Sequence, residues 1–311
     1  MGKYGSVDSR NHGYGRDMAY AGRQAVEAHY GGGHYASVAA HSDRWGQFAE
    51  HLREQGVRDM RDVTPEHVRG YAEAMAERGL AVATQQNHIS TLNVVLSHAR
   101  EGQWDRQSPA ALAGERSSVR DTAPATADRD TYRAAVDALR EQGHDRAASV
   151  VEMAREMGLR EREAALADTS RLQSEAAQYG AVNVQEGTKG GRDEDRWVPV
   201  TSEAQAAIDR AAEQAGPGGN LIGEGERWTD LRNELNSARE TLHEHGISGY
   251  HDARAAYACD RYEQLTGHAA PVVAGEREAD KVSDRDAREQ IAHELGHDRT
   301  DVAAAYVGSA R

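Results

Sequence analysis

Helical periodicity dominates this sequence, and one short stretch interrupts it. Apolar residues recur at the spacing of a helix face along most of the chain, beginning with residues 35–55. At 181–185 and 196–200 the period changes to that of short strands, and a Gly-rich, charged turn joins the two runs. The sequence therefore predicts a mainly α protein with one small antiparallel β-sheet, made by a single hairpin.

The 311 residues are enough for two domains with separate cores. Residues 1–34 are rich in Gly, Tyr, His and Ser and lack sustained periodicity, so we predict a flexible N-terminal arm. Three helical segments make residues 35–102 a small helical domain. Residues 103–127 carry prolines among small and polar residues, which favours an interdomain linker. Residues 128–311 then form a larger, mostly helical domain that contains the hairpin.

Several expected helices carry an end signal as well as an apolar face. Thr64-Pro65 is a typical helix start, and Gly56 is a typical stop. We expect the charged stretch 266–289 to be a loop before the last helices. The expected helices lie at about residues 35–55, 65–79, 82–101, 129–142, 144–157, 202–215, 227–244, 250–266 and 284–296, followed by a short helix that contains Tyr306.

Composition limits the class of protein. The chain has one cysteine, Cys259, which excludes an internal disulfide framework and fits a reducing compartment. No apolar run approaches the ~20 residues of a membrane span, and no signal peptide is recognisable. We therefore expect a soluble, cytoplasmic protein without a membrane partner.

The charge balance is unusual for a protein that binds nucleic acid. The formal net charge is −14, which taken alone argues against that class. Residues 1–115 carry 12 bases and 14 acids, however, so the acid excess lies mostly in the rest of the chain. A local basic surface matters more than the sum. Any DNA-reading surface is thus expected within residues 35–115.

The stretch "HELGH" contains the zinc-protease motif His293-Glu294-x-x-His297. Two imidazoles at i and i+4 share a helix face, and the glutamate would act as the base. The motif also needs a third ligand. In its longer form a glycine and a histidine would stand where this chain has Thr300 and Ala303, and no glutamate follows His297. The sequence therefore predicts no metal site here.

Four separated segments, "GLRERE", "GTKGGR", "GYHDAR" and "LGHDRTDVAAAY", carry polar residues in a suggestive order. Each alone is typical of a charged helix surface, a charged turn, a surface pair or a packed tyrosine. The residues are Arg160 and Glu163, Lys189, His251 and Arg254, and His297 and Tyr306, the last two nine positions apart. Lys189 is also one of only three lysines in the chain. In order and spacing the set resembles the tyrosine recombinases, or phage integrases.

The resemblance covers about residues 35–311 and implies a fold and an activity. The helical part is similar to the family's core-binding (SAM-like) domain, and residues 128–311 are similar to its catalytic domain. The implied function is site-specific DNA recombination through a 3′-phosphotyrosyl intermediate, integrating or excising a phage or other mobile element. Because that link conserves the bond energy, no metal, nucleotide or other cofactor is implied.

The resemblance also assigns roles to the polar residues. Tyr306 is the nucleophile, Arg160 and Arg254 clamp the phosphate oxygens, and His297 donates a further hydrogen bond. His251 can accept the tyrosine proton, and Lys189 protonates the leaving 5′-hydroxyl. Glu163 orients Arg160. The resemblance thus implies one supporting residue, Glu163, and six catalytic residues, which are Arg160, Lys189, His251, Arg254, His297 and Tyr306.

The implied partners are a double-stranded DNA recombination site, a tetramer of this chain during synapsis, and accessory DNA-bending proteins. Other functions stay open at this point. One is a DNA-binding accessory protein with the same fold and no turnover. Another is an enzyme similar to type IB topoisomerases, which use the same chemistry. The metalloprotease is the least favoured, because its third ligand is missing.

Overall fold

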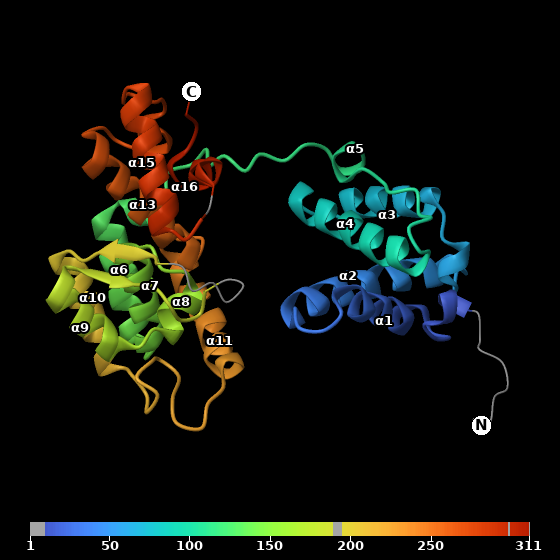
Figure 1. Cartoon of the computed structure of the whole chain (residues 1–311), viewed down its shortest axis with the longest axis horizontal. Coiled ribbons are helices and arrows are strands. Elements are labelled where there is room, and N and C mark those ends of the chain that lie inside the picture. The colour runs from blue at the N-terminus through green and yellow to red at the C-terminus, as the bar shows by residue number, and fades with distance from the viewer. Residues whose placement is uncertain (1–9, 189–194, 298, 311) are drawn as a thin grey trace. The chain divides into compact units, whose positions relative to one another are not determined.

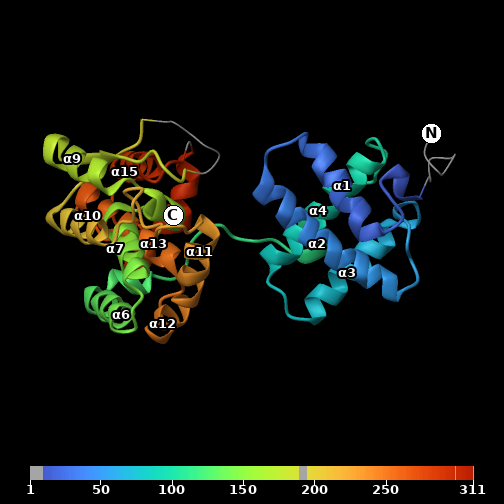
Figure 2. The same ribbon diagram turned by 90° about the horizontal axis from the view of Figure 1, so that it is seen from below.

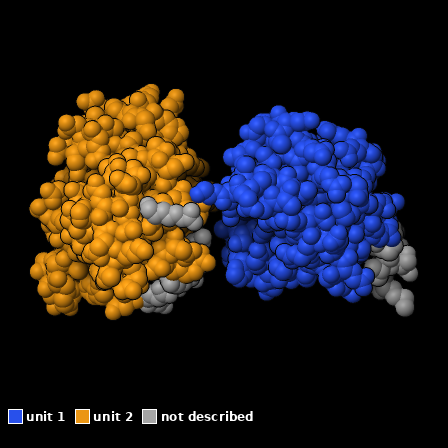
Figure 3. Space-filling model, turned by 90° about the horizontal axis from the view of Figure 1, so that it is seen from above, with its two compact units in different colours: residues 1–117 blue, residues 118–311 orange. Residues whose placement is uncertain are grey.

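The computed structural model of the chain describes residues 10–188, 195–297 and 299–310. It divides into two compact units, residues 1–117 and 118–311, shown in Figure 3. The predicted linker, residues 103–127, spans the boundary between them. Both of its ends are packed, because Trp104 lies in the core of the first unit and Thr126 is buried in the second.

The first unit is built from α-helices (Figure 1). The core of the unit joins buried side chains of α1 to α4, with Trp45 and Phe48 in edge-to-face contact. The helices are α1 (Met18–Tyr30), α2 (Tyr35–Glu54), α3 (Pro65–Glu77), α4 (Val82–Ala99) and α5 (Pro109–Ala113), with short 3-10 turns η1 (Arg10–Gly13) and η2 (Met60–Asp62). Helices α2, α3 and α4 agree with the predicted ranges 35–55, 65–79 and 82–101, whereas the short α5 lies within the predicted linker and was not predicted.

The prediction of a flexible arm over residues 1–34 is wrong for helix α1. Asp17 caps this helix by accepting a hydrogen bond from the Tyr20 amide, and its side chains Ala21, Ala25 and Val26 are fully buried against α2 and α4. The periodicity was hard to see because the buried face consists mainly of glycine and alanine. Small residues carry little hydrophobic signal, although they allow two helices to approach closely.

Gly22 shows how close that approach is. A Cβ atom at this position would lie 1.9 Å from Trp45 Nε1, and the same indole nitrogen donates a 2.8 Å hydrogen bond to Met18 O. The glycine therefore leaves the space in which the largest buried side chain of the unit sits.

The second unit is also mostly helical and has a two-stranded sheet (Figure 2). Its elements are η3 (Ala125–Ala127), α6 (Arg129–Glu141), α7 (Asp145–Met157), α8 (Glu161–Leu166), α9 (Thr169–Tyr179), β1 (Ala181–Asn183), β2 (Trp197–Pro199), α10 (Ser202–Glu213), α11 (Trp228–Ser237), α12 (Arg239–Glu244), α13 (Tyr250–Thr266), α14 (Pro271–Ala274), α15 (Lys281–Glu294), η4 (Thr300–Ala303) and α16 (Ala304–Val307).

Helix α7 forms the centre of this unit. It is covered by α6, α8, α10 and α13, and its residues from Ala147 to Met157 are all buried. The buried set includes Glu152, which pairs with Arg140 and Arg210 from two of the covering helices. Buried carboxylates therefore have guanidinium partners, as the low polarity of an interior requires.

The predicted hairpin is confirmed, with β1 antiparallel to β2 and Val182 opposite Val198. Both valines are buried. The turn that joins the strands contains residues 189–194, so Lys189 lies outside the described residues. The charged stretch 266–289 is not one loop, because it contains α14 and the first turns of α15, which Asp280 caps.

Mainly α structure with a small antiparallel sheet is therefore correct, and the sequence missed mostly short helices. Helix α9 went unpredicted because only three of its residues are buried. Among residues 10–188, 195–297 and 299–310, no helix combines the length and apolar character that crossing a membrane requires.

Gly22→Ala tests whether α1 belongs to the core. We expect the substitution to lower the free energy of unfolding of the first unit by about 1–3 kcal/mol, because the added methyl group overlaps Trp45. Urea unfolding combined with hydrogen exchange of the α1 and α2 amides measures this loss.

The matched control is Gly46→Ala on α2, where an added Cβ atom meets nothing within 4 Å. Because alanine favours a helix interior over glycine, this variant is expected to be as stable as the wild type or up to about 1 kcal/mol more stable. Equal stability of both variants would contradict the packing of α1.

Candidate active site

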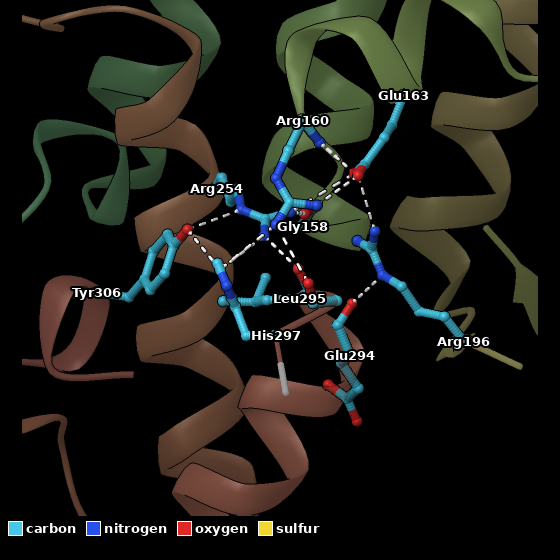
Figure 4. Close-up of polar contacts among 10 residues, drawn as sticks. Gly158, Arg160, Glu163, Arg196, Arg254, Glu294, Leu295, His297 and Tyr306 are labelled. Carbon is cyan, nitrogen blue, oxygen red and sulfur yellow. Dashed lines mark hydrogen bonds and ion pairs between the residues drawn. The ribbon is translucent and has the colours of Figure 1, made fainter. Parts of the chain in front are cut away.

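Five of the six predicted catalytic residues are described, and four of them meet at one point of the second unit (Figure 4). Arg160 precedes α8, Arg254 lies on α13, His297 follows α15, and Tyr306 is on α16. His251, on the first turn of α13, lies beside the ring of Tyr306. The sixth residue, Lys189, lies outside the described part of the chain.

The hydroxyl of Tyr306 is the point on which the other side chains converge. Arg254 Nε donates to it at 3.3 Å, and His297 Nε2 lies 3.1 Å from it. Tyr306 is 5% exposed and Arg254 is fully buried. The tyrosine oxygen therefore lies between a cationic hydrogen-bond donor and an imidazole nitrogen.

His297 Nε2 also lies 3.5 Å from Arg160 Nη2 and 3.5 Å from Arg254 Nη2. Guanidinium groups can only donate hydrogen bonds, so Nε2 fits this position best as an acceptor, with the proton on Nδ1. Desolvation, together with the charges of Arg254 and Arg160, lowers the pKa of His297 to about 4. The imidazole is therefore neutral at pH 7.

The sequence Leu-Gly-His forms the end of helix α15. Gly296 has φ +63°, its amide bonds His293 O, and the amide of His297 bonds Ala292 O, both at 2.8 Å. These two bonds make a Schellman motif, in which the left-handed position favours glycine. The motif fixes the backbone of His297 immediately beyond the helix.

Three successive carbonyl groups at this helix end each accept a hydrogen bond from a different arginine. Arg196 Nε donates to Glu294 O at 2.8 Å, Arg254 Nη2 donates to Leu295 O, and Arg160 Nη2 donates to Gly296 O at 3.4 Å. The last carbonyls of a helix lack partners within it and carry partial negative charge. The end of α15 is therefore a natural seat for guanidinium groups.

Glu163 holds the same three arginines from the other side (Figure 4). Its fully buried carboxylate lies 2.5 Å from Arg160 Nη1, 2.9 Å from Arg196 Nη1 and 3.7 Å from Arg254 Nη1. Burial alone would raise its pKa, but the three guanidiniums hold the pKa of Glu163 below its usual range. Glu163 is thus ionised, and it contacts Arg160 as the sequence predicted.

Arg196 is the member of this cluster that the sequence did not reveal. It stands two positions after the last undescribed residue of the turn and directly before β2. An arginine beside a charged turn is usually exposed, so nothing in the sequence distinguishes this one. Only the folded chain brings it to Glu163.

His251 occupies a different position from the one predicted for a proton acceptor. Its ring stands edge-on to that of Tyr306, with centroids 5.7 Å apart, and no hydrogen bond joins it to the hydroxyl. The ring keeps an exposed edge, although the protein atoms packed around it and the charges of Arg254 and Arg160 lower its pKa to about 4. A neutral imidazole can accept a proton, so this role stays a prediction.

The following residue, Asp252, ties α13 to the start of the unit. Its carboxylate accepts hydrogen bonds from Arg120 and from the amide and hydroxyl of Thr126. The amide of Arg120 in turn donates to Ala304 O, two residues before Tyr306, at 2.9 Å. Residues 120–126, at the start of the unit, therefore contact α13 and α16, the helices that carry Arg254 and Tyr306.

The contacts of Glu294 argue against the zinc-protease hypothesis. Its fully buried carboxylate accepts hydrogen bonds from Tyr257 at 2.7 Å and from Arg261 at 2.9 Å, so it is occupied as a structural partner. His293 is exposed. Within the described ranges, no three or more His, Cys, Asp or Glu side chains gather as a metal site would require.

Comparison with known families gives two matches that together span most of the chain. A family model described as "Phage integrase, N-terminal" matches residues 19–104, and one described as "Integrase" matches residues 114–260. The chain belongs to the phage integrase family, the tyrosine recombinases. The first match begins inside α1, in agreement with the packing of that helix. The second ends before His297 and Tyr306, so these two residues lie outside both matches and their positions come from the structure.

A comparison with solved structures matches two recombination proteins. The Tn1549 transposon integrase in complex with transposon right-end DNA has 13% sequence identity and a TM-score of 0.57, over 93% of this chain and 95% of the other. The XerA recombinase has 14% identity and a TM-score of 0.39, over 92% of each chain. A comparison with curated protein sequences gives no match. The Tn1549 likeness shows that this integrase shares its fold.

The lowered pKa of His297 predicts how stability depends on pH. Because the pKa is about 4 in the folded protein and near 6.5 in the unfolded chain, the unfolded chain binds more protons between these values. The fold therefore loses stability as the pH falls from about 6.5 to 4. We expect His297→Gln to lose less stability than the wild type over this range in urea unfolding. An unchanged pH dependence would contradict the neutral imidazole.

Proposed function

We propose that this chain is a site-specific DNA recombinase that cleaves and rejoins DNA through Tyr306. The observation that supports the proposal is the convergence of Arg254 and His297 on one buried tyrosine hydroxyl, with Arg160 against the same imidazole nitrogen. Cleavage of a phosphodiester needs a nucleophile and several cationic or neutral hydrogen-bond donors around the phosphate oxygens. The side chains gathered here supply both.

The proposed reaction is a transfer of phosphate between two oxygens. The hydroxyl oxygen of Tyr306 forms a bond to the scissile phosphorus, the bond from phosphorus to the 5′-oxygen breaks, and a 3′-phosphotyrosyl link results. The non-bridging oxygens gain negative charge in the transition state, and Arg160 and Arg254 stabilise it. Attack by another 5′-hydroxyl reverses the step and exchanges strands. No external energy source is required, because one phosphodiester replaces another.

Binding of DNA changes the partners of Tyr306 in this proposal. Without DNA, the tyrosine oxygen accepts a hydrogen bond from Arg254 Nε, and its hydroxyl lies 3.1 Å from the accepting nitrogen His297 Nε2. A phosphate oxygen takes the Arg254 donor, and it takes the place beside His297 when the imidazole proton moves from Nδ1 to Nε2. The hydroxyl is then displaced toward the in-line position, where the neutral His251 ring is the nearby acceptor for its proton. The leaving 5′-oxygen takes its proton from Lys189, a role that rests on the sequence.

The substrate in this proposal is a double-stranded recombination site in the cytoplasm, bound partly through residues 35–115. A phage or other mobile element is the DNA to be integrated or excised, and a tetramer assisted by DNA-bending proteins forms the synaptic complex. The N-terminal part has a small net charge, −2 over residues 1–115, so it repels DNA less than the rest of the chain does.

Tyr306→Phe tests the nucleophile. The variant is first used to enrich binding sites from a random pool of DNA duplexes, since it should bind without cleaving. A selected duplex, nicked near the cleavage point so that the leaving fragment diffuses away, is then incubated with the wild type in the presence of a chelator. We expect a covalent protein–DNA adduct from the wild type and none from Tyr306→Phe.

The other outcomes identify the alternatives. Specific binding with no adduct from the wild type would favour a DNA-binding accessory protein and reject the recombinase. An adduct accompanied by relaxation of supercoiled plasmid, with no exchange between two sites, would favour an enzyme similar to type IB topoisomerases.

Arg160→Ala tests the phosphate clamp. Its side chain is about one-fifth exposed, unlike that of the fully buried Arg254, so its loss should leave the fold intact. We expect the rate of adduct formation to fall by about 10²–10³-fold with little change in DNA affinity, as when a comparable transition-state donor is removed. Arg162→Ala removes the same charge from an exposed position on α8 and should cleave at the wild-type rate. Equal rates for both variants would refute the clamp.

A further inference from the structure

We propose that Arg196 is a positioning residue for DNA cleavage, which holds Arg160 and His297 in place through Glu163 and the end of α15. The inference rests on the proposed recombinase function. Arg196 makes no hydrogen bond to Tyr306 or His297, so it is not itself a catalytic residue. It instead contacts Glu163, which holds Arg160, and the end of α15, which precedes His297.

The side chain of Arg196 connects two elements of the site. Nη1 pairs with Glu163 on α8 at 2.9 Å, and Nε donates to Glu294 O at the end of α15 at 2.8 Å. The residue is 4% exposed, and its side chain lies between Glu163 and Glu294 at the right of Figure 4. Arg196 therefore fixes the distance between α8 and the turn that carries His297.

Arg160 depends on this connection because the two arginines share one oxygen. Oε1 of Glu163 contacts both Arg160 Nη1 and Arg196 Nη1. Arg160 keeps an exposed part for a phosphate, whereas Arg196 is enclosed. The enclosed guanidinium holds the carboxylate, and the carboxylate holds the guanidinium that faces substrate. Without Arg196, Glu163 keeps its bond from the Arg160 amide, but Oε1 loses the partner that balances Arg160 Nη1, so the pair can shift.

Arg196 also shapes the turn before His297. A Cβ atom on Gly296 would lie 3.0 to 3.3 Å from atoms of the Arg196 side chain. The guanidinium therefore packs directly against the glycine of the Schellman motif. A change at Arg196 removes the surface on which that turn rests.

The burial of Arg196 is unfavourable by itself, which argues against a role in stability alone. Nη2 is buried and has no hydrogen-bond partner among the residues that the structure describes. Removing the arginine would still leave Glu163 in contact with Arg160 and Arg254. The fold should therefore tolerate a neutral side chain of similar length, and the loss should appear in the reaction.

Arg196→Met is the test, with Arg171→Met as its matched control. Arg171 pairs with Glu175 and Glu186 and donates to Asn183 O on β1, so it anchors the same hairpin without contacting the site. At saturating protein and with the nicked duplex described above, we expect Arg196→Met to form adduct about 10–100-fold more slowly, at unchanged DNA affinity. Arg171→Met should keep the wild-type rate.

A double variant separates positioning from a general loss of structure. If Arg196 acts through Arg160, adding Arg196→Met to Arg160→Ala should slow cleavage much less than it slows the wild type. Arg196→Lys keeps a charge beside Glu163 but lacks the fork that also reaches Glu294 O, so an intermediate rate is expected. It also serves as the test if the methionine variant fails to fold.

Three results would overturn the positioning role. They are a wild-type rate for Arg196→Met or Arg196→Lys, fully additive losses in the double variant, or an equal loss in Arg171→Met. A wild-type protein that forms no Tyr306-dependent adduct would instead overturn the proposed function, so the two failures are distinguishable.

Discussion

The candidate active site of this integrase depends on three guanidinium groups held between one buried carboxylate and one helix end. Three like charges within a small volume would repel each other strongly in an interior of low dielectric constant. Glu163 offsets this repulsion on one side, and the carbonyls of residues 294–296 offset it on the other. Because the residue before α8, helix α13 and the residue before β2 each contribute one arginine, the cluster also joins these elements to α15.

Tyr306 belongs to the same arrangement, although its helix α16 has only four residues. A helix this short has little intrinsic stability, so its position must come from contacts. Those contacts are the hydrogen bonds of the tyrosine to Arg254 and His297 and the bond from the Arg120 amide to Ala304 O. In the proposed reaction Arg254 and His297 also bind the phosphate. Substrate and nucleophile then compete for the same two side chains, which links DNA binding to release of the tyrosine in that proposal.

The sequence predicted what depends on local patterns and missed what depends on distant contacts. Long helices with large apolar residues and the hairpin were visible from periodicity, and the spacing from His297 to Tyr306 indicated the site. Helix α1 was missed because its buried face is made of small residues. Arg196 was missed because a buried arginine is distinguishable from an exposed one only by its partners. The sequence assigned His251 to the same site as Tyr306, but the edge-on placement of its ring depends on how α13 and α16 pack.

The excess of acidic residues in the chain is compatible with cleavage of DNA, because salt limits the range over which charges interact. At physiological ionic strength, charges farther than about 8 Å from a phosphate are largely screened. Among the residues that the structure describes, Arg160, Arg196 and Arg254 share the carboxylate of Glu163, which leaves this cluster with a local excess of positive charge. Two nearby acids, Glu294 and Asp252, are engaged by Arg261 and Arg120. In the proposed reaction a phosphate at this cluster meets an attractive field, while the formal charge of −14 acts mainly on its approach.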